Sequence, residues 1–242
     1  MKNEEHTVIR MDVLGRKAWL KVFVEGERRF KLNILDLAAR RLGVPALRPP
    51  PHRGGEHACA TEKRRLEELA ACGACVPEVL GHGPRALLIG DIGVSLKTRL
   101  HETDAAGKTK LIVQAAQALG QVHGNGGHIG QPFARNLTVT DDGQIGFLDL
   151  EEDPRETMTL AQAQVRDWLI FAAGVSRYFA DPAVELADAL RPAVQKAAPE
   201  VRTELAQAVR QLGIVERIAW KLGERARRIA GALTGLRNAL AE

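Results

Sequence analysis

The stretch HGNGGHIGQPFARNLTVTDDGQIGFLDLEE, residues 123–152, carries the most structural information in the chain. A helical pattern ends at its start, a glycine-rich break follows, and a loop then leads to Asn136. Two short extended segments, 136–139 and 144–150, flank Asp141-Asp142-Gly143, and an Asp-Gly pair is typical of a β-hairpin turn. The stretch therefore predicts a helix, a loop and a hairpin in that order.

Asn136 and Asp149 stand at the two ends of this hairpin, where pairing of its strands brings an amide oxygen close to a carboxylate. Oxygen ligands of this kind are the ones that Mg²⁺ prefers in proteins. The alternative is an ordinary turn in which both side chains satisfy backbone groups. The hairpin alone leaves both interpretations open.

The glycines at 124, 126, 127 and 130 resemble a dinucleotide-binding loop only superficially. Such a loop needs a strand before it and a helix after it, so that a helix N-terminus meets the pyrophosphate. Here a helix precedes the glycines, and Pro132 and extended sequence follow them. The chain also has no Gly-Lys-Ser/Thr triplet, so the sequence excludes both a Rossmann loop and a P-loop.

The sequence before this stretch predicts a mixture of strands and helices. Segments 7–12 and 18–24 are rich in β-branched and aromatic residues and flank a turn at 14–17, so they predict a strand pair. The pattern then predicts a helix over 30–42, a proline-rich loop over 45–55, a helix over 60–71, and strands at 79–80 and 86–89.

After residue 90 the pattern is mainly helical, with the one hairpin. We expect helices over 108–123, 159–179, 182–196 and 199–240. The predicted fold class is α+β, with an N-terminal lobe over 1–90, a helical C-terminal lobe over 91–242, and their junction near Gly90–Gly93.

Composition excludes several classes of protein. The 242 residues include 34 Lys and Arg against 30 Asp and Glu, a net charge of +4, and only 4% aromatic residues, so we expect no nucleic-acid partner. Three cysteines argue against a disulfide framework. The N-terminal residues contain no apolar signal region, and no apolar run is long enough for a bilayer span. We therefore expect a cytoplasmic protein.

Cys72-Gly-Ala-Cys75 suggests a redox or zinc motif. A redox pair usually lies at a helix N-terminus, which lowers the thiol pKa, whereas this pair follows a predicted helix. A zinc site would need two more ligands, and Cys59, His57 and His82 offer them only at irregular spacing. We favour two small buried side chains at a helix exit.

Taken together, these segments resemble the protein-kinase-like fold, in particular the atypical bacterial branch that contains lipopolysaccharide (Kdo) kinases and RIO-type kinases. That branch typically reads His-x-x-Gly, then His-Gly-Asp, four residues, Asn, a hairpin and an apolar-apolar-Asp strand end. The matching positions here are His123, Gly126, Gly130, Asn136 and Phe147-Leu148-Asp149. The resemblance implies that Asn136 and Asp149 bind magnesium and act in catalysis.

The resemblance extends over about residues 9–172. Lys21, in a predicted strand, resembles the lysine that holds the ATP phosphates, and Glu62 resembles its helix partner. Val76–Gly81 resembles the VPxVL segment of this branch. Residues 88–93, which include Asp91, fall where the adenine-contacting hinge would lie, so Asp91 is a candidate cofactor-binding residue. Asp167 lies where such folds place an aspartate that braces the catalytic loop.

Two departures from the family pattern bear on catalysis. Gln131 replaces the catalytic aspartate and Ile129 replaces the preceding histidine, while His128 is out of register. A carboxamide can orient a hydroxyl but cannot accept its proton. In addition, no glycine-rich loop precedes the Lys21 strand, since Gly15 is the only glycine upstream. The resemblance therefore implies a truncated N-terminal lobe and a degenerate catalytic loop.

The leading hypothesis is a phosphotransferase that uses ATP and Mg²⁺ and modifies a hydroxyl of an envelope sugar, a lipopolysaccharide-type acceptor or a protein. Gln131 would orient the acceptor. The alternatives are a pseudokinase that binds nucleotide without transfer, and a basic scaffold that binds no nucleotide. Glu151, Glu152 and Asp153 would bind a second metal, act as a displaced base, or form a solvated acidic loop.

The C-terminal segment 217–237 is basic and amphipathic. Its apolar residues either pack on the helical lobe, with the arginines solvated, or lie on an anionic membrane surface. We favour packing and keep a peripheral contact with the inner membrane as the alternative. Its apolar stripe is Ile218, Leu222, Ile229, Leu233 and Leu236.

Overall fold

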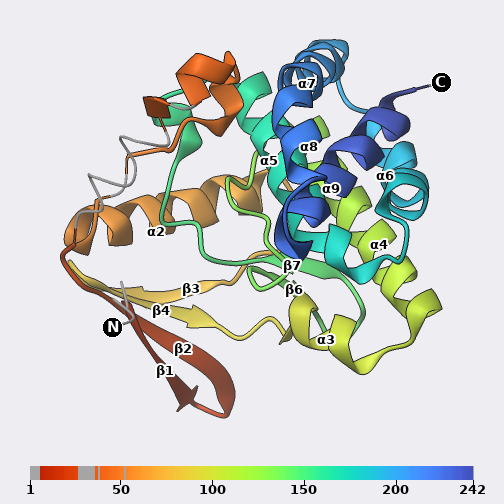
Figure 1. Cartoon of the computed structure of the whole chain (residues 1–242). Helices are drawn as coiled ribbons and strands as arrows, with labels where there is room; N and C mark the ends of the chain where they lie inside the picture. The colour runs from red at the N-terminus through yellow and green to blue at the C-terminus, as the bar shows by residue number, and fades with distance from the viewer. Residues whose placement is uncertain (1–5, 27–35, 38, 52, 242) are drawn as a thin grey trace.

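The computed structural model describes residues 6–26, 36, 37, 39–51 and 53–241. It is an α+β structure in which helices predominate and the strands form two small antiparallel sheets, as the sequence predicted. Figure 1 shows the larger sheet and α2 on one side and the mass of helices on the other. The helix expected over 30–42 lies partly outside the described residues, and positions 36, 37 and 39–42 are helical.

The larger sheet has the strand order β1-β2-β4-β3. The chain reverses between the first two strands in a tight two-residue turn, in which Leu14 and Gly15 both have positive φ. Helix α2 packs against the sheet through β2 and β4. The bounds are β1 His6–Val13, β2 Arg16–Phe23, α2 Gly55–Ala71, β3 Val79–His82 and β4 Ala86–Gly90. The strand predictions for this region are confirmed.

The chain passes from the larger sheet to the smaller one through residues 91–93. The smaller sheet has the order β5-β6-β7, and its last two strands are the predicted Asp-Gly hairpin. Its strands are β5 Val94–Ser95, β6 Leu137–Val139 and β7 Ile145–Phe147, and helices α3 Leu96–Glu102 and α4 Ala105–Gly124 lie between the first two of them in the chain.

The remaining chain is helical and surrounds α5, whose Trp168 and Phe171 are fully buried. Short helical turns η1 Pro45–Leu47, η2 Pro154–Glu156, η3 Ser176–Tyr178 and η4 Pro182–Leu186 lie between the longer helices. The long helices are α5 Leu160–Val175, α6 Ala187–Val194, α7 Pro199–Gln211, α8 Gly213–Ala219 and α9 Glu224–Leu240. Within the described ranges, no helix combines the length and apolar character that a bilayer span requires.

The single helix expected over 199–240 is wrong, because the structure has α7, α8 and α9 there. Gly213 and Gly223 lie at the two breaks, and glycine is a poor helix former because it loses the most backbone entropy on folding. The breaks let α9 fold back against α5, α6 and α7 instead of continuing away from them.

Candidate functional site

The candidate site is a cavity of about 450 Å³ between the larger sheet and the β6–β7 hairpin. Trp19 and Val8 come from the β1–β2 pair, Ile89 from β4, and Ile92 and Leu148 from the connecting segments, and together they form an apolar wall. Polar groups lie on the other wall. A cavity of this size with a few convergent polar groups is typical of small-molecule sites.

Lys21 is the centre of the polar wall. It is 5% exposed, and its Nζ lies 2.7 Å from Glu62 Oε2 and 2.8 Å from Asp149 Oδ1. Glu151 contributes a third carboxylate at 3.5 Å. Burial alone would lower the pKa of Lys21, but these carboxylates raise it above its ordinary value, so the amine is charged. Residues far apart in sequence therefore meet at one ammonium group.

Helix spacing positions Glu62 at this point. Ala58, Glu62, Leu66 and Leu69 lie on the buried face of α2, so Glu62 faces the sheet instead of solvent. Burial raises its pKa, while Lys21 opposes the shift. The carboxylate is 1% exposed and needs the lysine as its counterion.

Hairpin register places Asn136 next to Asp149. Leu137 pairs with Phe147, and the N–H of Leu148 donates to the carbonyl of Asn136 at 2.8 Å, so the two candidate ligands flank this closing pair. Both line the cavity. This register explains why Asp149 lies thirteen positions after Asn136 in the sequence.

Three carboxylates in the cavity region have the chemistry of a cation site. Ligand oxygens of Glu62, Asp149 and Glu151 all lie within 4.8 Å of one another. Hard oxygen donors with one amide nearby suit Mg²⁺. Thr138 also lines the cavity, and its buried hydroxyl has no hydrogen-bond partner in the described part of the chain.

Asp167 holds the loop that contains Gln131. This fully buried carboxylate accepts hydrogen bonds from the backbone N–H groups of Ile129 at 2.7 Å and Gly130 at 2.6 Å, and pairs with His123 Nε2 at 2.9 Å. Burial would raise its pKa, but the His123 pair and the backbone donors lower it. The prediction that Asp167 braces the loop is confirmed.

Gln131 lies outside the lining of the cavity and makes a specific contact beside it. Its side-chain Nε2 donates to Glu152 Oε2 at 2.5 Å, and its backbone carbonyl accepts from Asn136 Nδ2 at 3.1 Å. The Glu152 carboxylate therefore contacts the side-chain amide of Gln131 directly. The sequence indicates Glu151, Glu152 and Asp153 as candidates, but it does not indicate which of them contacts Gln131.

Asp91 supports the cavity without lining it. Its carboxylate accepts from Trp19 Nε1 at 2.9 Å and from the N–H of Gly93 at 2.9 Å, and both partners line the cavity. The Asp91 side chain itself borders a neighbouring, wider cavity of about 730 Å³. The structure therefore places this candidate as a brace for the apolar wall.

Sequence reasoning missed the link between α2 and the loop. Arg65 is 1% exposed and donates to the carbonyls of His128 at 2.7 Å and Ile129 at 3.0 Å, and its Nη1 lies 2.7 Å from His128 Nε2. Burial lowers the pKa of Arg65. The signal was its position three residues after Glu62, on the same buried face of the helix.

His128 and Asp153 complete this buried link. Burial lowers the pKa of His128, so the ring is neutral and Nε2 can accept from Arg65. Asp153 Oδ1 lies 3.2 Å from the same nitrogen, and Arg64 pairs with the other oxygen at 2.7 Å. His128, which the family pattern left out of register, is therefore a structural residue.

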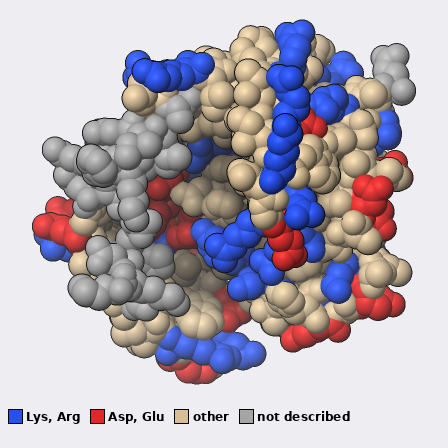
Figure 2. Space-filling view, in the orientation of Figure 1, with Lys and Arg blue, Asp and Glu red and all other residues tan. Residues whose placement is uncertain are grey.

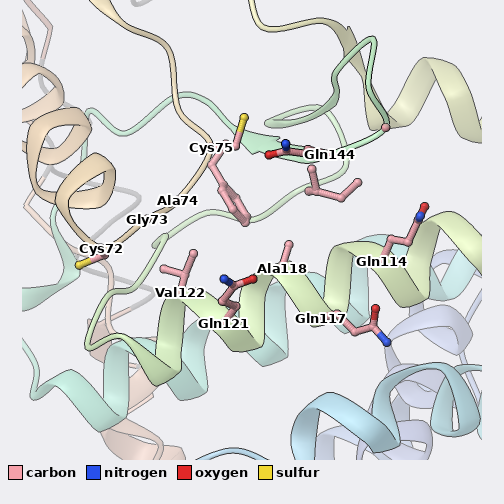
Figure 3. A pocket seen from close by; sticks show the side chains of 13 residues that line it. Cys72, Gly73, Ala74, Cys75, Gln114, Gln117, Ala118, Gln121, Val122 and Gln144 are labelled. Carbon is pink, nitrogen blue, oxygen red and sulfur yellow. The ribbon is translucent and has the colours of Figure 1, made fainter.

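The Cys72–Cys75 pair does not form a two-thiol site. Figure 3 shows the two sulfurs pointing away from each other, at different sides of a pocket lined by glutamines of α4. Both thiols are free and half-buried, so the expectation of two buried side chains is wrong. Burial and Asp142 raise the pKa of Cys75, which disfavours the reactive thiolate. The Cys75 carbonyl instead accepts from the N–H of Phe147 at 2.9 Å.

Comparison with protein-family models finds no match to the chain, and comparison with curated proteins finds none either.

Proposed function

We propose that the protein is a kinase-like phosphotransferase that uses ATP and Mg²⁺, with a small N-lobe over 1–90 and a mainly helical C-lobe over 91–242. The observation that carries this proposal is the convergence of Lys21, Glu62 and Asp149 in a cavity that Asn136 also lines. Positioning and neutralisation of phosphates are the main requirements of phosphoryl transfer. These residues supply both.

Each wall of the cavity has a role in this reaction. Trp19, Ile89 and Leu148 offer apolar surface to a purine ring, and Lys21 can reach phosphate oxygens while Glu62 holds its amine in place. Asn136 and Asp149, with Glu151 beside them, would hold Mg²⁺. When bound, this ion would neutralise charge that develops on the transferred phosphoryl group.

Gln131 and Glu152 handle the acceptor hydroxyl. The Gln131 amide orients it, and the Glu152 carboxylate beside that amide accepts its proton as the oxygen attacks the γ-phosphorus and ADP leaves. We assign the acceptor to an envelope sugar, a lipopolysaccharide-type glycolipid or a protein hydroxyl. The sequence resemblance supports this assignment.

Calorimetry of the full chain with MgATP tests the nucleotide site. We expect binding that weakens at least about tenfold in Lys21→Met and Asp149→Asn, because each substitution removes a charged phosphate or metal contact. Asp142→Asn, on the exposed hairpin turn, is the matched control and should bind like the parent. Absence of parental binding would refute the proposal and leave a scaffold.

Turnover separates the enzyme from the pseudokinase. ADP release is measured with envelope glycolipids and with generic protein substrates as acceptors. Tight MgATP binding without acceptor-dependent ADP release would show a nucleotide-binding module, and it would overturn the roles given to Gln131 and Glu152.

A further inference from the structure

The segment 213–229, which contains α8, a turn and the start of α9, presents apolar side chains to solvent. Ile214, Ile218 and Leu222 are each more than half exposed, and Trp220 and Ile229 are nearly so. Further along α9 the stripe changes, since Leu233 and Leu236 are buried against the helical core. The sequence 213–237 therefore has an uncovered half, residues 213–229, and a packed half further along α9.

The uncovered half is also strongly cationic. It holds five Lys and Arg against two Glu, an excess of three in a chain whose net charge is +4. In the described part of the structure, Arg217, Lys221, Arg225 and Arg227 form no ion pair, whereas Arg237 at the packed end pairs with Glu216. Figure 2 shows a column of Lys and Arg over α7 and α8.

We propose that segment 213–229 binds the surface of an anionic lipid bilayer. Unpaired cations interleaved with exposed Ile, Leu and Trp are the chemistry that such a surface recognises: the cations meet lipid phosphates, and the apolar side chains enter the boundary beneath them. Trp220 suits this boundary because its ring is amphipathic. This inference is independent of any catalytic activity.

A fluid bilayer fits this segment better than a protein partner does. Residues of 213–229 line none of the three cavities described above, and the segment offers exposed charge and apolar area. Protein interfaces depend on shape complementarity at an apolar centre, whereas a lipid surface adapts to the side chains it receives. Within the described ranges, four of the cations also form no ion pair that would have to break before they meet phosphate.

Vesicle sedimentation of the full chain tests the proposal. The parent should sediment with vesicles that contain phosphatidylglycerol and stay in solution with pure phosphatidylcholine. Arg217→Glu/Lys221→Glu should weaken binding roughly tenfold or more, because each basic residue near an anionic surface contributes a factor of about five. Lys97→Glu/Lys110→Glu makes the same charge change on exposed residues of α3 and α4 and should retain most of the binding.

An apolar variant separates insertion from charge attraction alone. Ile218→Asn/Leu222→Asn keeps the charge and should also weaken binding, whereas Leu14→Asn, at the fully exposed tip of the first hairpin, should not. Trp emission should shift to the blue with anionic vesicles, and Trp220→Phe should abolish the shift, since Trp168 is buried and Trp19 lies in the cavity wall outside the segment. Circular dichroism checks that each variant folds.

Three results would overturn the proposal. The first is a parent that stays in solution with anionic vesicles. The second is a parent whose binding is the same in both segment variants. The third is light scattering that shows a dimer which Ile218→Asn/Leu222→Asn converts to monomer, because a second copy would then cover this face.

Discussion

The backbone of Asp149 has a φ of +63°, in the left-handed region that few residues other than glycine adopt. Aspartate and asparagine tolerate this region better than residues with longer or branched side chains. The strain is maintained by the hairpin on one side and by Lys21 on the other. Asp149→Asn therefore removes the charge without adding backbone strain, and it is a cleaner probe than Asp149→Ala.

The pairing of Gln131 with Glu152 gives a prediction for single residues. Glu152→Gln should lower turnover about a hundredfold or more while MgATP affinity stays unchanged, because the proton acceptor is lost and the phosphate contacts are not. Gln131→Asp in that background should restore turnover by placing a carboxylate at the neighbouring position. The measurement is steady-state ADP release beside calorimetric binding.

A different result would locate the base elsewhere. If Glu151→Gln abolishes turnover at unchanged MgATP affinity and Glu152→Gln does not, the proton goes to the carboxylate nearer Lys21. Loss of MgATP binding in Glu151→Gln would instead make this carboxylate a metal ligand.

At the scale of elements, α2 is fixed to the loop at 128–130 by Arg65. Arg65→Met should lower the free energy of unfolding by about 3 kcal/mol or more, since it leaves the buried carbonyls of His128 and Ile129 without their donor. Lys63→Met, which removes a surface ion pair with Glu67 on the same helix, should cost less than about 1 kcal/mol.

Urea unfolding of both variants measures this difference. Equal effects of the two substitutions would mean that the buried link does not hold α2. Loss of nucleotide affinity in Arg65→Met, with the Lys21 amine untouched, would show that the link also positions Glu62.

Local signals predicted the elements that depend on local chemistry. The strands at 7–12 and 18–24 and the Asp-Gly hairpin follow from β-branched and aromatic residues and from turn residues within a few positions of them. The prediction of one helix over 199–240 is wrong because it was made from the spacing of apolar residues. Spacing does not include the conformational entropy that glycines such as Gly213 and Gly223 lose in a helix.

Contacts between distant residues were predicted only where a family pattern supplied them. The convergence of Lys21, Glu62 and Asp149 was expected from the resemblance, and the structure brings them together. Arg65 and His128 are 63 positions apart, and neither belongs to that pattern. Their pairing depends on tertiary packing, which no periodicity in the sequence specifies.

At the scale of the whole molecule, His128 makes stability depend on pH. Burial and the neighbouring Arg65 lower its pKa in the folded state, and Asp153 and Asp167 oppose this shift only in part. As pH falls below 6.5, the ordinary pKa of histidine, His128 is protonated in the unfolded chain but stays neutral in the folded chain. Stability should therefore decrease on acidification from about pH 7 to pH 5.

Urea unfolding across this range measures the slope. His128→Gln keeps an acceptor for Arg65 and cannot titrate, so the slope should flatten, whereas His101→Gln on the exposed end of α3 should leave it unchanged. At lower pH, protonation of Asp153 and Asp167 should reduce stability further, because their lowered pKa values mean that the ionised carboxylates stabilise the folded state. An unaltered slope in His128→Gln would exclude the buried imidazole as its source.

The position of Lys21 among three carboxylates has a consequence for the order of assembly at the site. The Lys21 ammonium already neutralises these carboxylates, so a divalent ion that binds without nucleotide would have to compete with it for their oxygens. In the proposed reaction, the phosphates of a nucleotide would attract that ammonium and carry a cation with them, so carboxylate oxygens would become free as the metal arrives. The proposed function therefore implies that Mg²⁺ and nucleotide would bind together, and that Lys21 would disfavour binding of the free ion.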